Sequence, residues 1–165
     1  MATIMGKKNL WLASDLQPHI MRDTRGLRSP NTHAFATFII MAKNTYDWEP
    51  TARQRINHVP CRLYERGMQF IAEQQGYGEL SAQESFDAAQ EGHGAKLKKE
   101  AKRLDSGAEA ASKDVQFLIE CGLVKQLRPQ RLGKNASYLL LLGDDAENQL
   151  VEDWARECIN HGWKK

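Results

Sequence analysis

The chain has 165 residues, 41% of them hydrophobic, and a formal net charge of +2. This length suits one domain with a flanking arm, and the small net charge by itself indicates no class of partner. No apolar run approaches the roughly 18 residues that a membrane-spanning helix needs, and the start lacks the apolar core and cleavage site of a signal peptide. We therefore expect no membrane segment.

Cysteine usage indicates the compartment. The chain has an odd number of cysteines, namely Cys61, Cys121 and Cys158. They lie far apart and form no C-x-x-C pair. The sequence therefore predicts neither a disulfide framework nor a zinc knuckle. A reducing cytoplasm is the simplest expectation.

Charge is distributed unevenly along the chain. Residues 79–91 hold four acids and no base, whereas residues 92–137 hold ten Lys or Arg against five Asp or Glu. Residues 1–30 carry a net charge of +3 and residues 138–165 a net charge of −3. This asymmetry is compatible with a nucleic-acid footprint, although many solvated faces look alike.

The first part of the chain reads as an arm, a helix and a loop. Residues 1–30 contain two prolines and little periodicity, which predicts a partly extended arm that wraps the domain or reaches a partner. Asn31 then precedes an apolar run, residues 34–42, whose length favours a buried helix over a strand. Residues 45–59 show no clear period and are expected to form a loop.

A second helix is expected over residues 60–76. Pro60 suits a first helical position, and Gly76 suits a helix stop. One face would bury residues at i, i+4 and i+7, namely Tyr64, Met68 and Ile71. Residues 77–94 are acidic and contain glycines, which predicts a linker with at most a short helical turn.

The strongest regularity lies in residues 94–121. Small and apolar residues recur there at alternating spacings of four and three, as an a/d stripe: Leu97, Ala101, Leu104, Ala108, Ala111, Val115 and Leu118. The unbroken spacing predicts one nearly continuous helix through Gly107, and the alternative is two helices sharing a face. The stripe would either pack internally or form a two-fold interface, and therefore a homodimer.

Two strands and a last helix are expected to complete the chain. Residues 123–127 and 136–142 read as strands, joined by a basic loop that contains Pro129 and Gly133. Asp144 then begins a helix with acids in its first turn, as the helix dipole prefers. Its core face would carry Leu150, Val151, Trp154 and Cys158.

Catalytic and metal motifs are weak. "EGHGAK" has glycines and a lysine but not the spacing of a phosphate-binding loop, and no strand precedes it. The five histidines show neither i, i+4 pairing nor an H-E-x-x-H motif, so no metal site and no cofactor is expected. Cys61 is better explained as a small buried hydrophobe than as a nucleophile. We expect no enzyme activity.

The order of elements leads to a resemblance. "SKDVQFLIECGLVKQLRPQRLGKNASYLLLL" resembles the recognition helix and wing of winged helix-turn-helix DNA-binding proteins. "PCRLYERGMQFIAEQQGY" is similar to the preceding helix in helix-turn-helix proteins of actinobacterial plasmids, prophages and phages, which have replication or regulatory roles. The resemblance covers roughly residues 32–142.

This resemblance implies a mainly α fold with a small β-hairpin, a long third helix and a C-terminal helix. It divides the chain into an arm (residues 1–30), a winged-helix domain (31–143) and a C-terminal helix (144–165) that packs on the domain or on a partner. The function implied is sequence-specific binding of double-stranded DNA, as a transcriptional regulator or replication-origin binder of a mobile element. The competing hypothesis is a winged-helix adaptor that binds protein.

The resemblance also implies which side chains contact DNA. The long helix would lie in the major groove and present Lys98, Lys99, Lys102, Arg103, Ser112 and Lys113. The wing would follow phosphates or enter a minor groove with Arg128, Gln130, Arg131, Lys134 and Asn135. Arg103 is the candidate base reader because its planar fork suits guanine, whereas Lys99 and Lys102 are candidate phosphate clamps.

Overall fold

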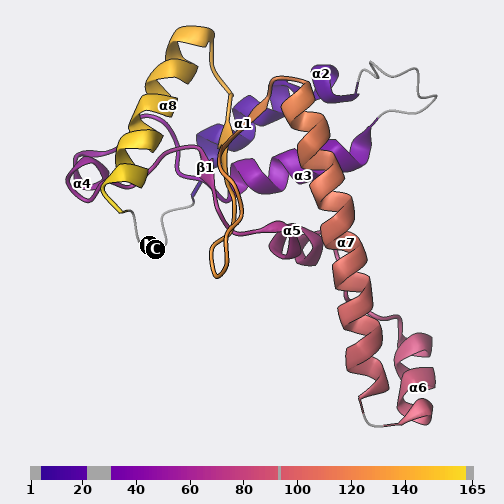
Figure 1. Ribbon diagram of the computed structural model, residues 1–165. Coiled ribbons are helices and arrows are strands. Elements are labelled where there is room, and N and C mark those ends of the chain that lie inside the picture. Colours follow the sequence, from indigo (N-terminus) through magenta and orange to yellow (C-terminus); the bar gives the residue numbers. More distant parts are fainter. Residues whose placement is uncertain (1–4, 22–30, 93, 163–165) are drawn as a thin grey trace.

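The computed structural model describes residues 5–21, 31–92 and 94–162. Within these ranges the chain forms eight helices and three short strands (Figure 1). In chain order they are α1 (Lys7–Asp15), α2 (Gln17–Met21), α3 (Thr32–Lys43), α4 (Ala52–Ile56), β1 (Leu63–Tyr64), α5 (Met68–Gln74), α6 (Ala82–Glu91), α7 (Ala95–Glu120), β2 (Val124–Arg128), β3 (Ser137–Leu140) and α8 (Asp145–Asn160). The fold is therefore mainly helical with a small sheet, as the sequence predicts.

The three strands form one antiparallel sheet in the order β1–β3–β2. The predicted hairpin is confirmed as β2 and β3, which are joined by the loop 129–136. The predicted helix over residues 60–76 is wrong in its first half, because β1 pairs with β3 and the Leu140 N–H donates to the Arg62 carbonyl at 2.9 Å. The helix is limited to α5, and Gly76 follows its end with φ +84°, as a helix stop requires. Tyr64 and Ile71 are nevertheless buried core residues.

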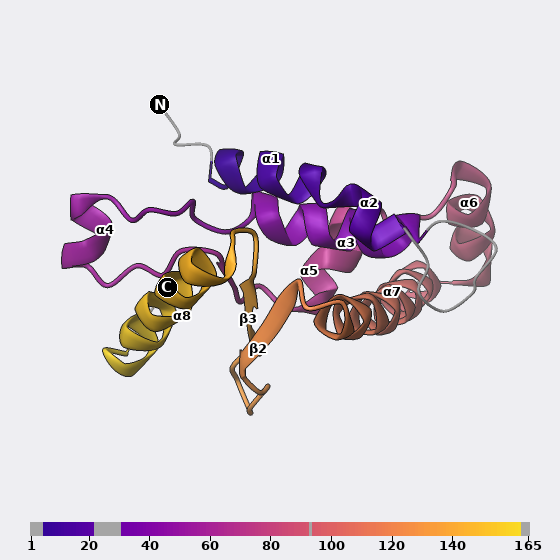
Figure 2. The same cartoon turned by 90° about the horizontal axis from the view of Figure 1, so that it is seen from above.

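The N-terminal arm is not extended where the structure describes it. Helices α1 and α2 pack along α3 and bury Ala13 and Ile20 (Figure 2). Gly6 precedes α1 with φ +67°, and a Cβ there would lie 2.3 Å from the Ala42 carbonyl oxygen. Glycine therefore permits the start of α1 to approach the end of α3. The remaining residues of the expected arm, 1–4 and 22–30, lie outside the described ranges.

Two short helices occur where a loop and a linker were expected. Helix α4 begins with a capping box between Thr51 and Gln54, and α6 begins with one between Ser81 and Glu84. In each box the N-cap hydroxyl and the third helical side chain satisfy two backbone N–H groups reciprocally. The same spacing is visible in the sequence as T-A-R-Q and S-A-Q-E, so this signal could have predicted both helices.

Helix α7 is continuous through Gly107, which confirms the prediction from the a/d stripe. A Cβ at Gly107 would lie 2.4 Å from Tyr77 Cγ and 2.8 Å from Ala72 Cβ. The glycine therefore lets the end of α5 and the following turn cross α7 in direct contact. From Ala111 onward the stripe is buried, Ala108 is partly exposed, and Leu97 in the first turn is 71% exposed. The N-terminal part of α7 packs beside α6, and these elements project from the rest of the molecule (Figure 1). We call α6 together with the first half of α7 (residues 95–106) the helical arm.

A polar network fastens the C-terminal half of α7 to α3. Asp114 is buried, and its Oδ2 accepts from Thr37 Oγ1 at 2.7 Å and lies 2.5 Å from His33 Nδ1. His33 Nε2 lies 3.1 Å from the Tyr77 hydroxyl, and Gln75 Nε2 donates to Thr37 Oγ1 at 2.9 Å. The buried Asp114 carboxylate is tolerated because its contacts with Thr37 and His33 replace the hydrogen bonds that water would otherwise make to it.

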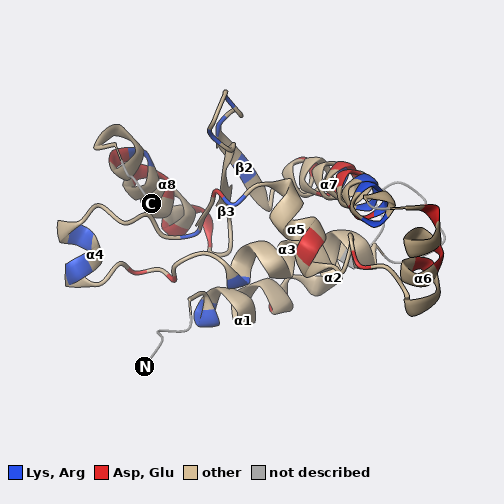
Figure 3. Ribbon diagram, turned by 90° about the horizontal axis from the view of Figure 1, so that it is seen from below, with Lys and Arg blue, Asp and Glu red and all other residues tan. Residues whose placement is uncertain are grey.

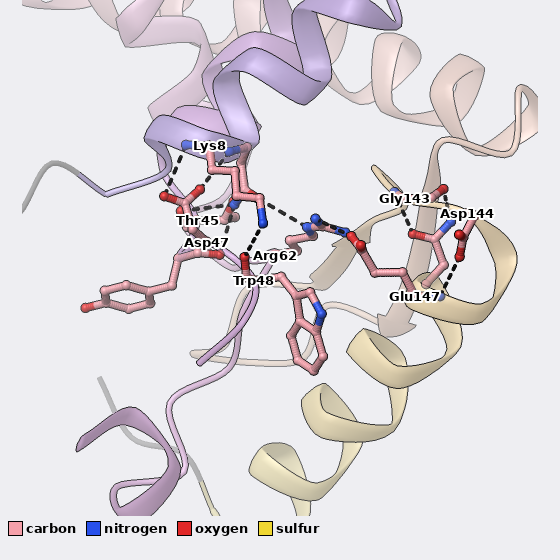
Figure 4. A network of polar contacts seen from close by, with 11 residues as sticks. Lys8, Thr45, Asp47, Trp48, Arg62, Gly143, Asp144 and Glu147 are labelled. Atoms are coloured by element: carbon pink, nitrogen blue, oxygen red, sulfur yellow. Dashed lines mark hydrogen bonds and ion pairs between the residues drawn. The ribbon is translucent and has the colours of Figure 1, made fainter. Parts of the chain in front are cut away.

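Helix α8 is attached through a second buried network, which Figure 4 shows. Arg62 is 0% exposed, and its Nη2 lies 2.6 Å from Glu147 Oε1 on α8. On its other side, Arg62 Nε donates to Asn9 Oδ1 at 3.2 Å, and Asn9 Nδ2 donates to Thr45 Oγ1 at 3.1 Å. Asp47 caps the start of α1 by accepting from the Asn9 N–H at 2.7 Å. Helix α1, the loop after α3, β1 and α8 therefore meet at one guanidinium.

The core face of α8 was predicted correctly apart from its first member. Val151 and Cys158 are buried, and Trp154 Nε1 donates to the Val59 carbonyl at 3.0 Å. Leu150 is instead 59% exposed. The helix turns its Val151, Ala155 and Cys158 side toward the sheet, which leaves Leu150 on the solvent side.

The close approach at Gly107 can be tested by adding a methyl group. Gly107→Ala should lower the free energy of unfolding by about 1–3 kcal/mol, because overpacking against Tyr77 outweighs the roughly 1 kcal/mol gained in helix propensity. In a Tyr77→Ala background the same substitution should cost less. Equal cost in both backgrounds, measured by urea denaturation, would contradict this explanation.

The buried guanidinium can be tested from its partner. Glu147→Gln should lower the free energy of unfolding by about 2–4 kcal/mol, because Arg62 then keeps a charge without a neutralising partner. Glu73→Gln, on an exposed side chain of α5, is the matched control and should change stability by less than about 0.5 kcal/mol. Similar stability of the two variants in thermal and urea unfolding would show that Arg62 does not depend on Glu147.

Candidate nucleic-acid interface

A groove of about 700 Å³ lies between α5, the middle of α7 and the β2–β3 hairpin. Its first wall is the turn into α5, its second is one side of α7, and its third is the hairpin. We call it the hairpin groove; it is lined by Arg66, Gly67, Met68, Gln69, Asp105, Ala108, Glu109, Ser112, Gln130, Asn135, Ala136 and Tyr138. Three of the eleven residues assigned to DNA contact from the sequence therefore line it: Ser112, Gln130 and Asn135.

The base of the hairpin is fixed to the turn that follows β1. Glu65 Oε1 accepts from Arg128 Nη2 at 2.6 Å and from Ser137 Oγ at 2.5 Å. Asn135 Nδ2 donates to the Glu65 carbonyl at 3.0 Å. Arg128 is thus half-buried and its charge is neutralised, so it is not the freely exposed loop cation expected from the sequence. Arg128 and Asn135 hold the hairpin in place and shape the third wall.

The tip of the hairpin is exposed and carries two cations. Arg131 and Lys134 exchange backbone hydrogen bonds at 3.0 and 2.9 Å, and Gly133 between them has φ +71°. Their side chains are exposed, as are those of Gln130 and Leu132. Two positive charges and one apolar side chain therefore stand beyond the groove on a closed turn. We call residues 130–134 the hairpin tip.

The lysines and the arginine at the start of α7 face another groove. Lys99, Lys102 and Arg103 line a cavity of about 600 Å³ between α7, α6 and the turn after α5. Lys99 Nζ lies 2.6 Å from Glu91 Oε1, and Arg103 pairs with Glu84 and donates to the Glu79 carbonyl at 2.9 Å. Figure 3 shows these opposite charges side by side on α7 and α6. Lys98 and Lys113 are exposed on α7.

The ion pair with Arg103 is part of the cap of α6. The pKa of Glu84 lies below its usual range, first because its carboxylate accepts from the Ser81 N–H and then because Arg103 lies beside it. The acidic segment 79–91, expected as a linker, is thus the electrostatic partner of the basic start of α7. Charges that looked free in the sequence are compensated within the chain.

Several groove residues were missed from the sequence. Arg66 lies in the turn before α5, and Gln69 lies in the first turn of α5. Arg66 Cζ is 4.7 Å from the centre of the Phe70 ring. Arg66 and Gln69 were expected within one helix over residues 60–76, and Gly67, the N-cap of α5 with φ +85°, is the signal that could have separated β1 from α5. Asp105 and Glu109 were overlooked because only cations and one serine, Ser112, were considered on α7. Carboxylates are acceptors and can accept from cytosine amino groups in a major groove.

The groove and the hairpin tip beside it therefore offer two chemical functions. Arg66 in the turn before α5 and the tip cations Arg131 and Lys134 can contact phosphates, and Glu109 with Ser112 in the groove lining offers acceptor and hydroxyl groups to base edges. Cys61 and Cys158 offer no comparable reactivity, because burial raises the pKa of Cys61 to about 12 and that of Cys158 to about 11. Such thiols stay protonated and pack as small apolar groups, as was predicted for Cys61.

Among the described residues, no helix is both long enough and apolar enough to cross a bilayer. Comparison of the chain with protein-family models, with curated proteins and with solved structures finds no match.

Proposed function

We propose that this protein binds double-stranded DNA sequence-specifically as a winged helix, with the hairpin groove as its DNA-contacting surface. The observation that carries the proposal is the connectivity: helix α3, strand β1, helices α5 and α7, then the β2–β3 hairpin, with β3 central in the sheet. In a winged helix this order places the recognition helix beside an exposed hairpin. Here α7 is that helix and the hairpin tip is the wing.

In this proposal the middle of α7, rather than its start, enters the major groove. Ser112 and Glu109 face the hairpin groove, whereas Arg103 and Lys99 are engaged by carboxylates of α6. Base reading thus moves from Arg103, the candidate from the sequence, to Glu109 and Ser112. Arg131 and Lys134 contact phosphates or enter a minor groove beside it. The helical arm projects at the N-terminal end of α7 (Figure 1), and α6 is an insertion between the two central helices α5 and α7.

The biological role that fits is a transcriptional regulator or a replication-origin binder of a mobile element, acting in the cytoplasm and without catalysis. A homodimer formed through the exposed start of the α7 stripe would give such a protein two half-sites. A transcriptional regulator and a replication-origin binder would both contact DNA through the hairpin groove.

A protein-binding adaptor is the second candidate, and a specific observation favours it. Apolar side chains are exposed at the projecting parts: Leu132 at the hairpin tip, with Phe86 and Leu97 on the helical arm. An apolar interface would be almost independent of salt, whereas phosphate contacts weaken steeply as salt rises. Selection of bound sequences from a random duplex pool, followed by affinity measurements over a salt series, separates the candidates. Failure to enrich any sequence, with no binding at low salt, would favour the adaptor.

The hairpin tip is expected to supply phosphate contacts. Replacing Arg131 and Lys134 together with alanine should weaken binding to all duplexes and reduce the salt dependence by about two phosphate contacts. The matched control replaces Lys7 and Lys43, exposed on α1 and α3, with alanine, because α1 lies on the side opposite the tip (Figure 2). Equal salt slopes for the two double variants would remove the tip from the interface.

Two serines on α7 distinguish the hairpin groove from the cavity beside α6. Ser112 and Ser106 each donate to the carbonyl four residues earlier at 3.0 Å, but Ser112 lines the hairpin groove and Ser106 the other cavity. Ser112→Glu should weaken specific binding at least about tenfold by repelling phosphate, and Ser106→Glu should not. The reverse result in fluorescence-anisotropy titrations would place DNA beside Lys99, Lys102 and Arg103 instead.

A further inference from the structure

Two histidines and a glutamate from distant parts of the chain meet away from the hairpin groove. His58 follows α4, whereas Glu157 and His161 stand one helical turn apart at the end of α8. Their candidate ligand atoms all lie within 4.8 Å of one another. The spacing between Glu157 and His161 places both side chains on one side of α8. No sequence pattern indicated the site, because only the fold brings His58 to Glu157 and His161.

The geometry brings the two imidazoles together without a hydrogen bond between them and the carboxylate. The rings of His58 and His161 are stacked, with centroids 4.0 Å apart and an interplanar angle of 14°. His58 Nδ1 lies 3.9 Å from Glu157 Oε1, which is too far for a hydrogen bond. This nitrogen is shielded from solvent and has no hydrogen-bond partner among the described residues. A bound cation would supply the partner that this imidazole nitrogen lacks.

The surrounding structure holds His58 beside the end of α8. Trp154, one turn before Cys158 on α8, donates from Nε1 to the carbonyl of Val59, the residue after His58. The Trp154 ring also lies against the His58 ring, with centroids 6.0 Å apart and an interplanar angle of 22°. The turn after α4 is therefore attached to α8 at the site itself. Glu157 and His161 are exposed and can rotate, whereas His58 is partly buried.

We propose that His58, Glu157 and His161 form a binding site for a divalent transition-metal ion of the zinc type. Two imidazole nitrogens and one carboxylate oxygen are a ligand set that Zn²⁺ uses, with water as a fourth ligand. Tetrahedral coordination brings ligand atoms to about 3.3 Å from one another, so the exposed side chains of Glu157 and His161 turn inward on binding. The bound ion would connect the end of α8 to the turn after α4. This inference is independent of the proposed DNA binding.

The test is a titration of the untagged full-length chain with ZnCl₂, followed by calorimetry and thermal unfolding. The wild type should bind one Zn²⁺ at this site, and its melting temperature should rise because the ion binds the folded state. Glu157→Gln and His161→Ala, at exposed positions, should each weaken binding at least about tenfold and abolish the rise. His19→Ala, on an exposed histidine of α2, is the matched control and should behave as the wild type.

Co²⁺ in place of Zn²⁺ identifies the ligands independently of stability. A nitrogen and oxygen site gives visible d–d bands without the charge-transfer band of a thiolate, which separates this site from Cys121. The inference is overturned if the wild type binds neither ion. It is also overturned if His161→Ala binds Zn²⁺ as tightly as the wild type, or if the Co²⁺ complex shows thiolate ligation.

Discussion

The buried guanidinium of Arg62 is the interaction on which the placement of the other elements depends. A charge that is 0% exposed cannot be left without partners, so Asn9 on α1 and Glu147 on α8 must both be present beside it. The pair with Glu147 is held by charge rather than by an aligned hydrogen bond, and Nη1 has no partner in the described part of the chain. Because Arg62 directly precedes β1, this anchor also fixes the strand that pairs with β3 and hence the position of the hairpin.

Two further devices bring the other walls of the hairpin groove to the sheet. Glu65 ties the base of the hairpin to the turn before α5 through Arg128 and Ser137. Gly107 lets the end of α5 touch α7, and Asp114 then fastens α7 to α3. Each device joins segments far apart in sequence with a short contact. These contacts together set the relative positions of the three walls of the groove.

The ion pairs seen in the structure change the interpretation of the charge distribution. A helix rich in lysine and arginine suggests a polyanion-binding surface, yet Lys99 and Arg103 are compensated by α6, and Arg128 by Glu65. The hairpin tip carries only two exposed cations, Arg131 and Lys134. A DNA complex built on this surface would therefore depend on a small number of phosphate contacts and on shape, rather than on a broad positive field.

The sequence by itself determined the elements whose signals are local. The start signal and length of an apolar run predicted α3, the a/d periodicity predicted the unbroken α7, and turn residues between apolar runs predicted the hairpin. An acidic first turn predicted α8. Tertiary structure alone decided the rest. Leu63 and Tyr64 became a strand because β3 offers them hydrogen-bonding partners, although their local pattern suits a helix. Likewise, whether a lysine or an arginine stays free depends on carboxylates that folding brings near it. Of the eleven residues assigned to DNA contact, Ser112, Gln130 and Asn135 line the hairpin groove, because composition gives the charge of a side chain but only packing gives its direction and its partner.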